Sequence, residues 1–428
     1  MRALGIFVWL GLAGSLAGQT GGPDPEALLA RIKAHVGESL KRLPNYTCLE
    51  TVERFERRGG SSPLVLVDRL RLEVAMVGNK EFYAWPGESK FEEKTIVQLI
   101  PNGTIGNGDF ALHAYAVFVA RGPAFTYAGE TDRNGRRLIR FDYRVADTES
   151  GFILLVPPHE AQVAYHGSFL VDRETLDLVR LEVVAADIPP DLGLTEAVDA
   201  MEYSRVRIGG GVFTLPASSE LLLKKPFDIE SRNRTGFSRC RQFTGESLLT
   251  FGETTLAEQP RTQPAAAKEA LPLAATLNLI LETAIDSATS AVGDEVSARL
   301  ESDVKKGGTV LIPRGARLTG RITVLARISE PAPHFEVRLN FFTLDFGRRQ
   351  ADFTARLEGI IAPGGESTYQ TRALRVPYAS NRQTFVMISG APPTSGAADL
   401  VVTGDRAELP RGLRLIWRTA DKEGETRP

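Results

Sequence analysis

Metal-binding and redox-active residues are scarce in this sequence, which holds 2 cysteines and 5 histidines among 428 residues. The best cluster places His159 and Glu160 near His166. This histidine spacing separates two rings on a helix by about two turns, and it puts them on opposite faces of a strand. Neither geometry lets the rings share one metal ion, and a third ligand is missing. We therefore expect no metal site and interpret both as loop histidines near the start of a strand.

An excess of one charge and long apolar runs are also lacking. The 51 Lys and Arg residues balance 53 Asp and Glu residues, and the net charge is -2. This balance gives no bulk attraction to nucleic acid or to an anionic membrane. Beyond residues 3–16, no apolar run approaches the roughly 20 residues of a spanning helix. We expect neither a nucleic-acid partner nor a transmembrane segment in the mature chain.

The motifs of common enzymes are missing as well. The chain has no Gly-x-Ser-x-Gly turn for a hydrolase nucleophile and no glycine-rich phosphate loop with a lysine. Carboxylates are spread along polar faces and turns, where their spacing makes no working pair: Glu130, Asp132, Asp142 and Asp147. We therefore expect a protein without enzymatic activity or cofactor, and we assign no catalytic residue.

What the sequence does contain begins with an export signal. A short positive start, Met1-Arg2, is followed by an apolar run over 3–16 and by small residues before a cut at Ala17-Gly18. We predict a signal peptide over 1–18 and a periplasmic or secreted protein. No cysteine lies near the cut, so lipoprotein processing is not expected.

The two cysteines, Cys48 and Cys240, lie near the two ends of the first predicted domain, each in a strand-like segment. In an exported protein we expect them to form a disulfide. Closing so long a loop stabilises the folded state by about 5 kcal/mol if only the entropy of the unfolded chain is counted. The alternative is a pair of buried free thiols, a common state of cysteine in protein cores.

Glycine and proline are abundant, with 40 and 25 residues, and they separate segments in which apolar and polar residues alternate. Such alternation is typical of a strand that is buried on one face. The clearest examples lie in 136–146 and in 292–328, where Pro313-Arg314-Gly315 predicts a turn. The sequence predicts a mainly β protein with a few helices, of the α+β class.

Two helices are predicted in the first half of the chain. Asp24 is the expected N-cap of the first, over 24–43, whose apolar stripe should lie on a sheet. The second, over 110–121, follows an expected cap at Asp109 and is apolar on nearly every side. A helix of this kind must be covered by the rest of the fold.

Residues 46–252 resemble the LolA-like lipoprotein-carrier fold. The resemblance rests on FLVDRETLDLVRLEV at 169–183, a strand, an acidic turn and a strand, with the apolar helix at 110–121 as a plug. It implies an N-terminal helix and a curved antiparallel sheet that forms half a barrel, within a domain spanning 24–253. It also implies that acyl chains or lipoproteins bind in the hollow of the sheet.

The candidate ligand-binding residues are the aromatic and aliphatic side chains on and after the plug helix: Phe110, Leu112, Tyr115, Phe118 and Phe125. They would line an apolar cavity beneath the helix. Ordinary core packing explains the same residues, because a hollow must stay unfilled to bind a ligand.

A linker and a second domain complete the chain. Residues 254–271 are rich in Pro, Ala and Gln without an apolar period, which predicts the linker. The second domain is expected over 272–420, before a polar tail at 421–428. Its segments IPRGARL and LPRGLRL, at 312–318 and 409–415, predict one turn used at two corners of a small closed β-barrel.

The strand after the first of these turns should be buried on one face. Five residues are expected to face inward: Leu318, Ile322, Val324, Ala326 and Ile328. Four arginines in this region are interspersed with acidic residues and indicate a solvated strand face: Arg314, Arg317, Arg321 and Arg327.

The second domain is similar to the TrbI-like barrel of conjugation and type IV secretion channels. The similarity covers 277–417 and rests on ILETAIDSATSAVGDEVSARLESDV followed by LIPRGARLTGRI. Those channels carry an apolar helical hairpin through the outer membrane. Residues 376–400 are polar and broken by proline here, so we expect no pore.

These observations predict an exported cell-envelope protein without enzymatic activity. It would bind a hydrophobic ligand or a lipidated partner in the N-terminal half-barrel and dock through the C-terminal barrel. The alternative is an envelope or secretion-associated scaffold that acts only through protein contacts. The two hypotheses differ in one structural expectation: a carrier has an open concave face near Phe118, and a scaffold has a filled one.

Overall fold

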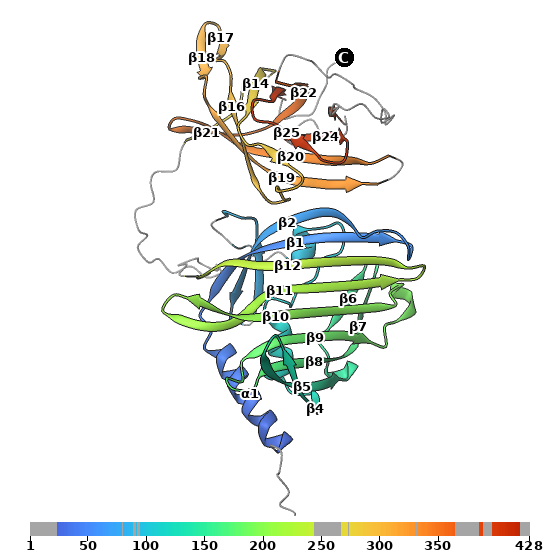
Figure 1. The fold of residues 1–428 in the computed structure, drawn as a ribbon. Coiled ribbons are helices and arrows are strands. Elements are labelled where there is room, and N and C mark those ends of the chain that lie inside the picture. Colours follow the sequence, from blue (N-terminus) through green and yellow to red (C-terminus); the bar gives the residue numbers. More distant parts are fainter. Residues whose placement is uncertain are drawn as a thin grey trace, which may run out of the picture.

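The computed structural model describes residues 24–243 and 267–419, except 79, 89–90, 92–94, 273, 330–331, 364–384 and 388–395. The predicted signal peptide and C-terminal tail, most of the linker and most of 376–400 lie outside these residues. The described chain forms two ten-stranded sheets, one from blue to green and one from yellow to red in Figure 1. The predicted mainly β class with a few helices is confirmed.

The first sheet is antiparallel and curls into a half-barrel (Figure 1). Its strand order is β3-β2-β1-β12-β11-β10-β9-β8-β5-β4, so the first strand pairs with the last. The strands are β1 (Tyr46–Arg58), β2 (Val65–Val77), β3 (Lys80–Ala84), β4 (Ala124–Arg133), β5 (Arg136–Val145), β8 (Ala164–Asp172), β9 (Leu178–Ala186), β10 (Glu196–Ile208), β11 (Gly211–Lys225) and β12 (Ile229–Gln242). A separate hairpin is formed by β6 (Ile153–Val156) and β7 (His159–Gln162).

The acidic turn predicted between two strands joins β8 to β9. The Oδ1 atom of Asp172 accepts the backbone N–H groups of Glu174 and Thr175, each at 3.0 Å. A side-chain acceptor at the start of a turn fixes the reversal locally. Beyond the turn, Phe169 and Leu181 lie opposite each other and are fully buried.

Helix α1 (Pro25–Lys41) confirms the first predicted helix. The side chain of Asp24 accepts the N–H of Glu26 at 3.0 Å, as an N-cap does. Its apolar stripe shares one core with inward residues of β5, β8 and β9: Leu28, Ile32, Val36, Leu40, Phe141, Phe169 and Leu181.

The second predicted helix is shorter than expected. Helix α3 spans Leu112–Phe118, and its N-cap is Ala111 without a side-chain hydrogen bond. The prediction that Asp109 is the cap is therefore wrong, because this carboxylate accepts a hydrogen bond from Ser219 on β11 instead. A shorter helix, α2 (Ile96–Leu99), precedes it and carries a capping box formed by Thr95 and Gln98.

The second sheet has the order β13-β21-β20-β19-β16-β14-β26-β22, with β24 pairing β20 and β23. Its strands are β13 (Ala267–Glu269), β14 (Thr276–Leu281), β16 (Glu295–Leu300), β19 (Arg317–Ile328), β20 (His334–Phe346), β21 (Arg349–Asp352), β22 (Ala355–Ile361), β23 (Phe385–Met387), β24 (Ala397–Thr403) and β26 (Arg414–Thr419). Two small ladders accompany it, β15 (Ile285–Asp286) with β25 (Glu408–Leu409) and β17 (Val304–Lys306) with β18 (Thr309–Ile312).

An aromatic group shows that the second sheet wraps around a core. The rings of Phe341 on β20 and Trp417 on β26 meet edge to face at 5.8 Å, although three strands separate them in the sheet order. Phe353 contacts the same indole at 5.2 Å. Trp417 is fully buried.

The two PRG turns have equivalent geometry, as the sequence predicts. Gly315 donates its N–H to the carbonyl of Leu300 at 2.9 Å, and Gly412 donates to Leu281 at the same distance. Both glycines have a φ of 87°, a backbone value that residues with a side chain rarely adopt. The repeated segment therefore fixes two similar corners.

Strand β19 departs from the predicted alternation. Its register with β20 shifts just before Val324. Beyond this bulge the buried side chain is that of Leu325, whereas Val324 and Ala326 were expected to face inward. Arg321 is not on a solvated face either, since its side chain is 11% exposed and its guanidinium lies over the ring of Trp85.

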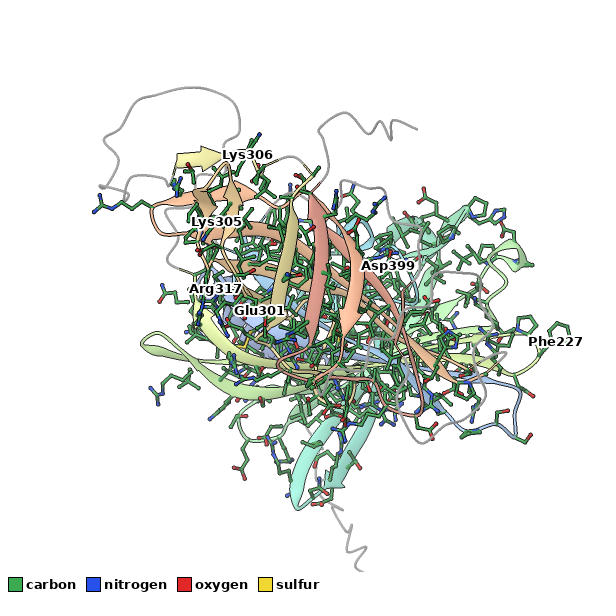
Figure 2. All side chains as sticks on the ribbon, turned by 90° about the horizontal axis from the view of Figure 1, so that it is seen from above. Phe227, Glu301, Lys305, Lys306, Arg317 and Asp399 are labelled. Atoms are coloured by element: carbon green, nitrogen blue, oxygen red, sulfur yellow. A yellow bond between two sulfur atoms is a disulfide. The ribbon has the colours of Figure 1, made fainter. Side chains whose placement is uncertain are left out.

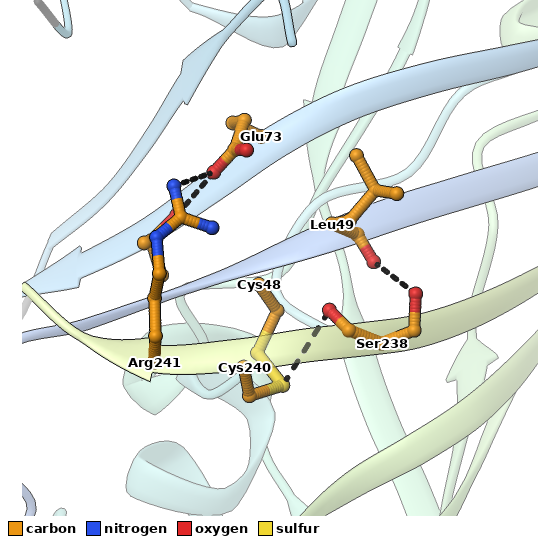
Figure 3. Close-up of a disulfide and its surroundings, with 7 residues drawn as sticks. Cys48, Leu49, Glu73, Ser238, Cys240 and Arg241 are labelled. Atoms are coloured by element: carbon orange, nitrogen blue, oxygen red, sulfur yellow. Dashed lines mark hydrogen bonds and ion pairs between the residues drawn. A yellow bond between two sulfur atoms is a disulfide. The ribbon is translucent and has the colours of Figure 1, made fainter. Parts of the chain in front are cut away.

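Cys48 on β1 and Cys240 on β12 form the predicted disulfide (Figure 3). The bridge joins residues 192 positions apart. Beside it, Glu73 accepts hydrogen bonds from Thr47 at 2.9 Å and from Arg241 at 3.1 Å. A covalent link and a polar cluster thus tie the first and last strands of the half-barrel.

The two sheets meet along β2 (Figure 1). Val292 forms a parallel bridge with Leu70, donating its N–H to Arg69 and accepting that of Arg71, both at 2.8 Å. The guanidinium of Arg71 also pairs with Asp294. Buried apolar residues of the two sheets form one continuous core.

The closest approach at this junction is made by Gly293. Its φ is 103°, and an added Cβ would lie 2.2 Å from the carbonyl oxygen of Arg71 and 3.0 Å from Trp85. A hollow of about 230 Å³ lies beside the junction, lined in part by Leu66, Leu325 and Phe335.

Candidate functional site

The predicted ligand-binding residues lie on the concave side of the half-barrel. Phe110 and Phe118 are buried, at 1% and 3% exposure. Leu112, Tyr115 and Phe125 are half-buried. Phe110 and Leu112 pack in the core that includes β1 and β2, Phe118 and Phe125 pack in the core shared with α1, and Tyr115 contacts both.

Aromatic contacts fill the space around these residues. The Phe118 ring meets that of Phe169 edge to face at 4.9 Å, and Phe125 meets Phe169 at 6.1 Å. Phe110 lies 4.9 Å from the ring of Tyr46. The concave face near Phe118 is thus packed in this conformation, and a ligand must displace part of the protein to reach it.

The part that covers the concave face is the plug segment, Asn102–Phe118. Glu81 on β3 holds it through backbone groups. The carboxylate accepts the N–H groups of Gly108 at 3.0 Å, Ala111 at 2.9 Å and Leu112 at 3.3 Å. The plug segment is therefore bound to the sheet partly by its main chain.

Two side chains of the plug segment reach polar groups of the sheet. The Nε2 atom of His113 lies 3.3 Å from a carboxylate oxygen of Asp199 on β10. Asp109 accepts the hydroxyl hydrogen of Ser219 on β11. Both contacts are buried, and they add side-chain specificity to the backbone contacts of Glu81.

The start of the plug segment is held by Arg54 on β1. Its guanidinium makes a bidentate pair with Asp68 at 2.7 and 2.6 Å and donates to the carbonyl of Asn102 at 2.5 Å. Gly103 is required here, because its φ is 77° and a Cβ would lie 2.5 Å from the guanidinium.

Cross-strand register explains why these polar groups meet. Asp199 lies opposite Leu221, Leu221 opposite Asn233, and Asn233 opposite Arg54. In the next row Ser219 lies opposite Thr235. These polar residues, together with Glu50 on β1, form one polar band that runs across β10, β11, β12 and β1.

This band was not predicted, although the amino-acid sequence carries a signal for it. Glu50 occupies the inward position between Cys48 and Val52, and Asp199 occupies the inward position between Ala197 and Met201. Acidic residues at the inward positions of apolar alternations mark buried carboxyls. Spacing along the chain does not reveal that the two strands bring them to one face.

Burial and mutual repulsion shift the ionisation of this cluster. Burial, followed by the charges of Asp109 and Glu81, raises the pKa of Glu50 well above its usual range. The pKa of Asp109 is raised to about 7, mainly by burial and by Asp199. Burial acts to lower the pKa of His113, but Asp199 and the other carboxylates outweigh it and the pKa is raised.

The cluster does not have the arrangement of a Ser-His-Asp triad. His113 contacts Asp199, whereas the hydroxyl of Ser219 donates to Asp109, so the ring does not activate the hydroxyl. Among the described residues, no three His, Cys, Asp or Glu side chains are placed to hold a metal ion. The same part of the chain contains no helix that is long and apolar enough to cross a membrane.

The other histidines and carboxylates weighed in the sequence lie apart from this cluster. His159 and His166 are on strands β7 and β8 rather than in loops. Glu130 pairs with Arg137 at 3.1 Å and with Arg173 at 2.8 Å at the surface. These residues belong to solvated faces and salt bridges.

Comparison with known proteins gives a limited result. No family model and no curated protein matches the sequence. A crystal structure of a DUF1329 family protein from Desulfovibrio piger covers 54% of this chain and 98% of its own, with a TM-score of 0.30 and 12% identity. A putative outer membrane lipoprotein-sorting protein domain from Vibrio parahaemolyticus covers 52% and 94%, with a TM-score of 0.31 and 10% identity.

Proposed function

We propose that the protein works in the cell envelope, without enzymatic activity, and binds a hydrophobic ligand or a lipidated partner in its half-barrel. The plug segment covers this site and moves aside when the ligand enters. The disulfide between Cys48 and Cys240 supports an oxidising compartment outside the cytoplasm.

The observation that carries the proposal is the way in which the plug segment is held. Its regular structure is limited to the seven residues of α3, and Glu81 binds three of its backbone N–H groups. An incoming ligand can replace such contacts one for one. Beneath the plug segment, apolar side chains of β1 and β2, including Val52 and Leu72, offer surface to an aliphatic chain.

The second domain is proposed to dock the carrier to another envelope component. Figure 2 shows Lys305 and Lys306 on the projecting β17–β18 hairpin and Arg317 on β19. The side chains of Lys305 and Arg317 are 57% and 60% exposed. Because Lys305 pairs with Asp303 and Arg317 with Glu295, this exposed surface carries charges of both signs and suits a polar partner surface.

A binding experiment with hydrogen exchange tests the carrier function. Purified protein is delipidated and titrated with the neutral fluorescent probe N-phenyl-1-naphthylamine, and native mass spectrometry detects ligand retained before delipidation. We expect saturable binding and faster amide exchange at Ala111 and Leu112, whose N–H groups leave Glu81. Strand β9 is the internal control and should keep its protection.

The alternative function is an envelope scaffold, and the filled interior near Phe118 favours it. A scaffold has no need of an opening plug segment. Failure to bind the probe at saturating concentration, with unchanged exchange over 102–118, would support the scaffold and reject the carrier.

A further inference from the structure

The contacts of the plug segment restrict the chemistry of any ligand that replaces it. The plug segment offers hydrogen-bond donors to two carboxylates of the sheet, Glu81 and Asp199. The donors are the N–H groups of Gly108, Ala111 and Leu112 and the ring of His113. Since Leu112 and His113 are consecutive, the two carboxylates receive donors from neighbouring positions of the chain.

Departure of the plug segment removes both His113 and Asp109, and it leaves the wall with an excess of carboxyl groups over basic groups. Glu50, Glu81 and Asp199 stay on the strands, while His113 leaves with the plug segment. Arg54 also stays, but its guanidinium remains in the bidentate pair with Asp68. A ligand that brings a positive charge would offset this excess.

Unpartnered polar atoms point to the same chemistry. Glu50 Oε2, Asp199 Oδ1 and the hydroxyl of Tyr46 lack a hydrogen-bond partner within the described residues. The three residues are only 2%, 4% and 0% exposed. A buried acceptor without a donor destabilises the fold, so the wall has unused binding capacity even with the plug segment in place.

We propose that Glu50, Glu81 and Asp199 bind the primary ammonium head of a cationic amphiphile, whose aliphatic tail lies on the apolar surface uncovered by the plug segment. This inference rests on the proposed carrier function and names its ligand class. An ammonium group carries three donors, one positive charge and no acceptor. A carboxylate head would instead be repelled, and an alcohol head offers one donor without charge.

A head-group series tests the inference on the unmodified protein. Dodecylamine, dodecanol and dodecanoate, each below its critical micelle concentration, compete with the bound neutral probe. We expect the amine to displace the probe at about tenfold lower concentration than the alcohol, since its hydrogen bonds are charge-assisted. Dodecanoate should be the weakest competitor.

Two variants locate the head group. Asp199→Asn and Glu50→Gln keep the side-chain shape and replace a carboxyl that can pair with an ammonium by a neutral amide, so each should lower the preference for amine over alcohol about fivefold or more. Binding of dodecanol should weaken much less, because its head offers one donor and no charge. Glu196→Gln is the matched control, because Glu196 lies on β10 but pairs with Lys224 at the surface.

The outcomes separate the two proposals. Equal displacement by amine and alcohol overturns the ammonium site and leaves the carrier function intact. Failure of all three compounds, together with failure of the probe to bind, removes both. The relative affinities of the three head groups are measured on the unmodified protein, so misfolding of a variant does not decide the result.

Discussion

Arg71 of β2 forms an ion pair with Asp294 across the junction of the two sheets. The backbone of the same arginine donates to Val292, so side chain and main chain both bind the second domain. Strand β3 pairs with β2 only from Glu73 to Val77, and Asp294, a loop residue, contacts β2 beyond that pairing. The domains are therefore joined by specific contacts as well as by apolar packing.

Gly293→Ala tests this junction. The new Cβ would clash with the carbonyl of Arg71, so the variant should lose about 2 kcal/mol or more of unfolding free energy. We expect urea unfolding to separate into two transitions as the domains uncouple. Gly308→Ala is the control, because its φ of 83° carries similar backbone strain with no atom within 4 Å of the added Cβ. Equal behaviour of the two variants would contradict the role of Gly293.

Reduction of the disulfide should destabilise the half-barrel. The loop it closes spans 192 residues, and loop entropy alone gives an upper figure of about 5 kcal/mol. Thermal unfolding of wild type in reducing buffer and of a Cys48→Ala, Cys240→Ala double variant should show the same lowered midpoint. An unchanged midpoint in both would show that hydrogen bonding between β1 and β12 suffices without the bridge.

Replacement of Asp109 should change the pH dependence of stability. The unfolded chain releases this proton near the ordinary pKa of 3.8, whereas burial and Asp199 raise the folded pKa to about 7. Between these values the unfolded state binds fewer protons, so stability falls as pH rises, by up to about 1.4 kcal/mol per pH unit. Asp109→Asn removes this loss, and the variant should gain stability relative to wild type from about pH 4 to about pH 7.

Urea titrations across this pH range measure the difference between the two proteins. Glu81, Asp199 and His113 face Asp109 in both proteins, so the comparison isolates the substituted group. The control is Asp142→Asn, at an exposed position paired with Arg140. Parallel stability profiles for wild type and Asp109→Asn would show that this carboxyl ionises without cost.

Leu112→Glu should abolish uptake of the neutral probe with little loss of stability. The side chain is half-buried at the start of α3, so its new charge lies in the path of the ligand and still reaches water. Phe118 is unsuitable for this purpose, because at 3% exposure a charge there would unfold the core. Leu155→Glu, at a position 45% exposed, is the matched control for charge alone. Normal probe binding by Leu112→Glu would place the ligand elsewhere.

Much of the fold follows from local patterns in the sequence. The cap at Asp24, the turn at Asp172 and the repeated PRG corners depend on neighbouring residues, and each is found where the sequence places it. Strand β4 and the β6–β7 hairpin escaped prediction. Most of their residues are exposed, so they carry little apolar alternation.

The candidate site was only half predictable. The aromatic residues around Phe118 stand out as an apolar run, but the band formed by Glu50, Asp199 and Arg54 depends on the pairing of distant strands. The prediction that Arg321 lies on a solvated face was wrong for a similar reason. A strand pattern tells which residues share a face, and it does not tell that a second domain covers that face.

The order in which the chain is made gives the junction a further consequence. The half-barrel leaves the ribosome before Val292 is synthesised. Until then the outer edge of β2 near Leu70 lacks the backbone partner that Val292 provides. In this interval, nascent chains would expose unpaired backbone N–H and C=O groups of β2 to one another, which favours self-association. A gene truncated after the first domain should therefore yield oligomers or inclusion bodies, and supplying the second domain as a separate chain should restore solubility.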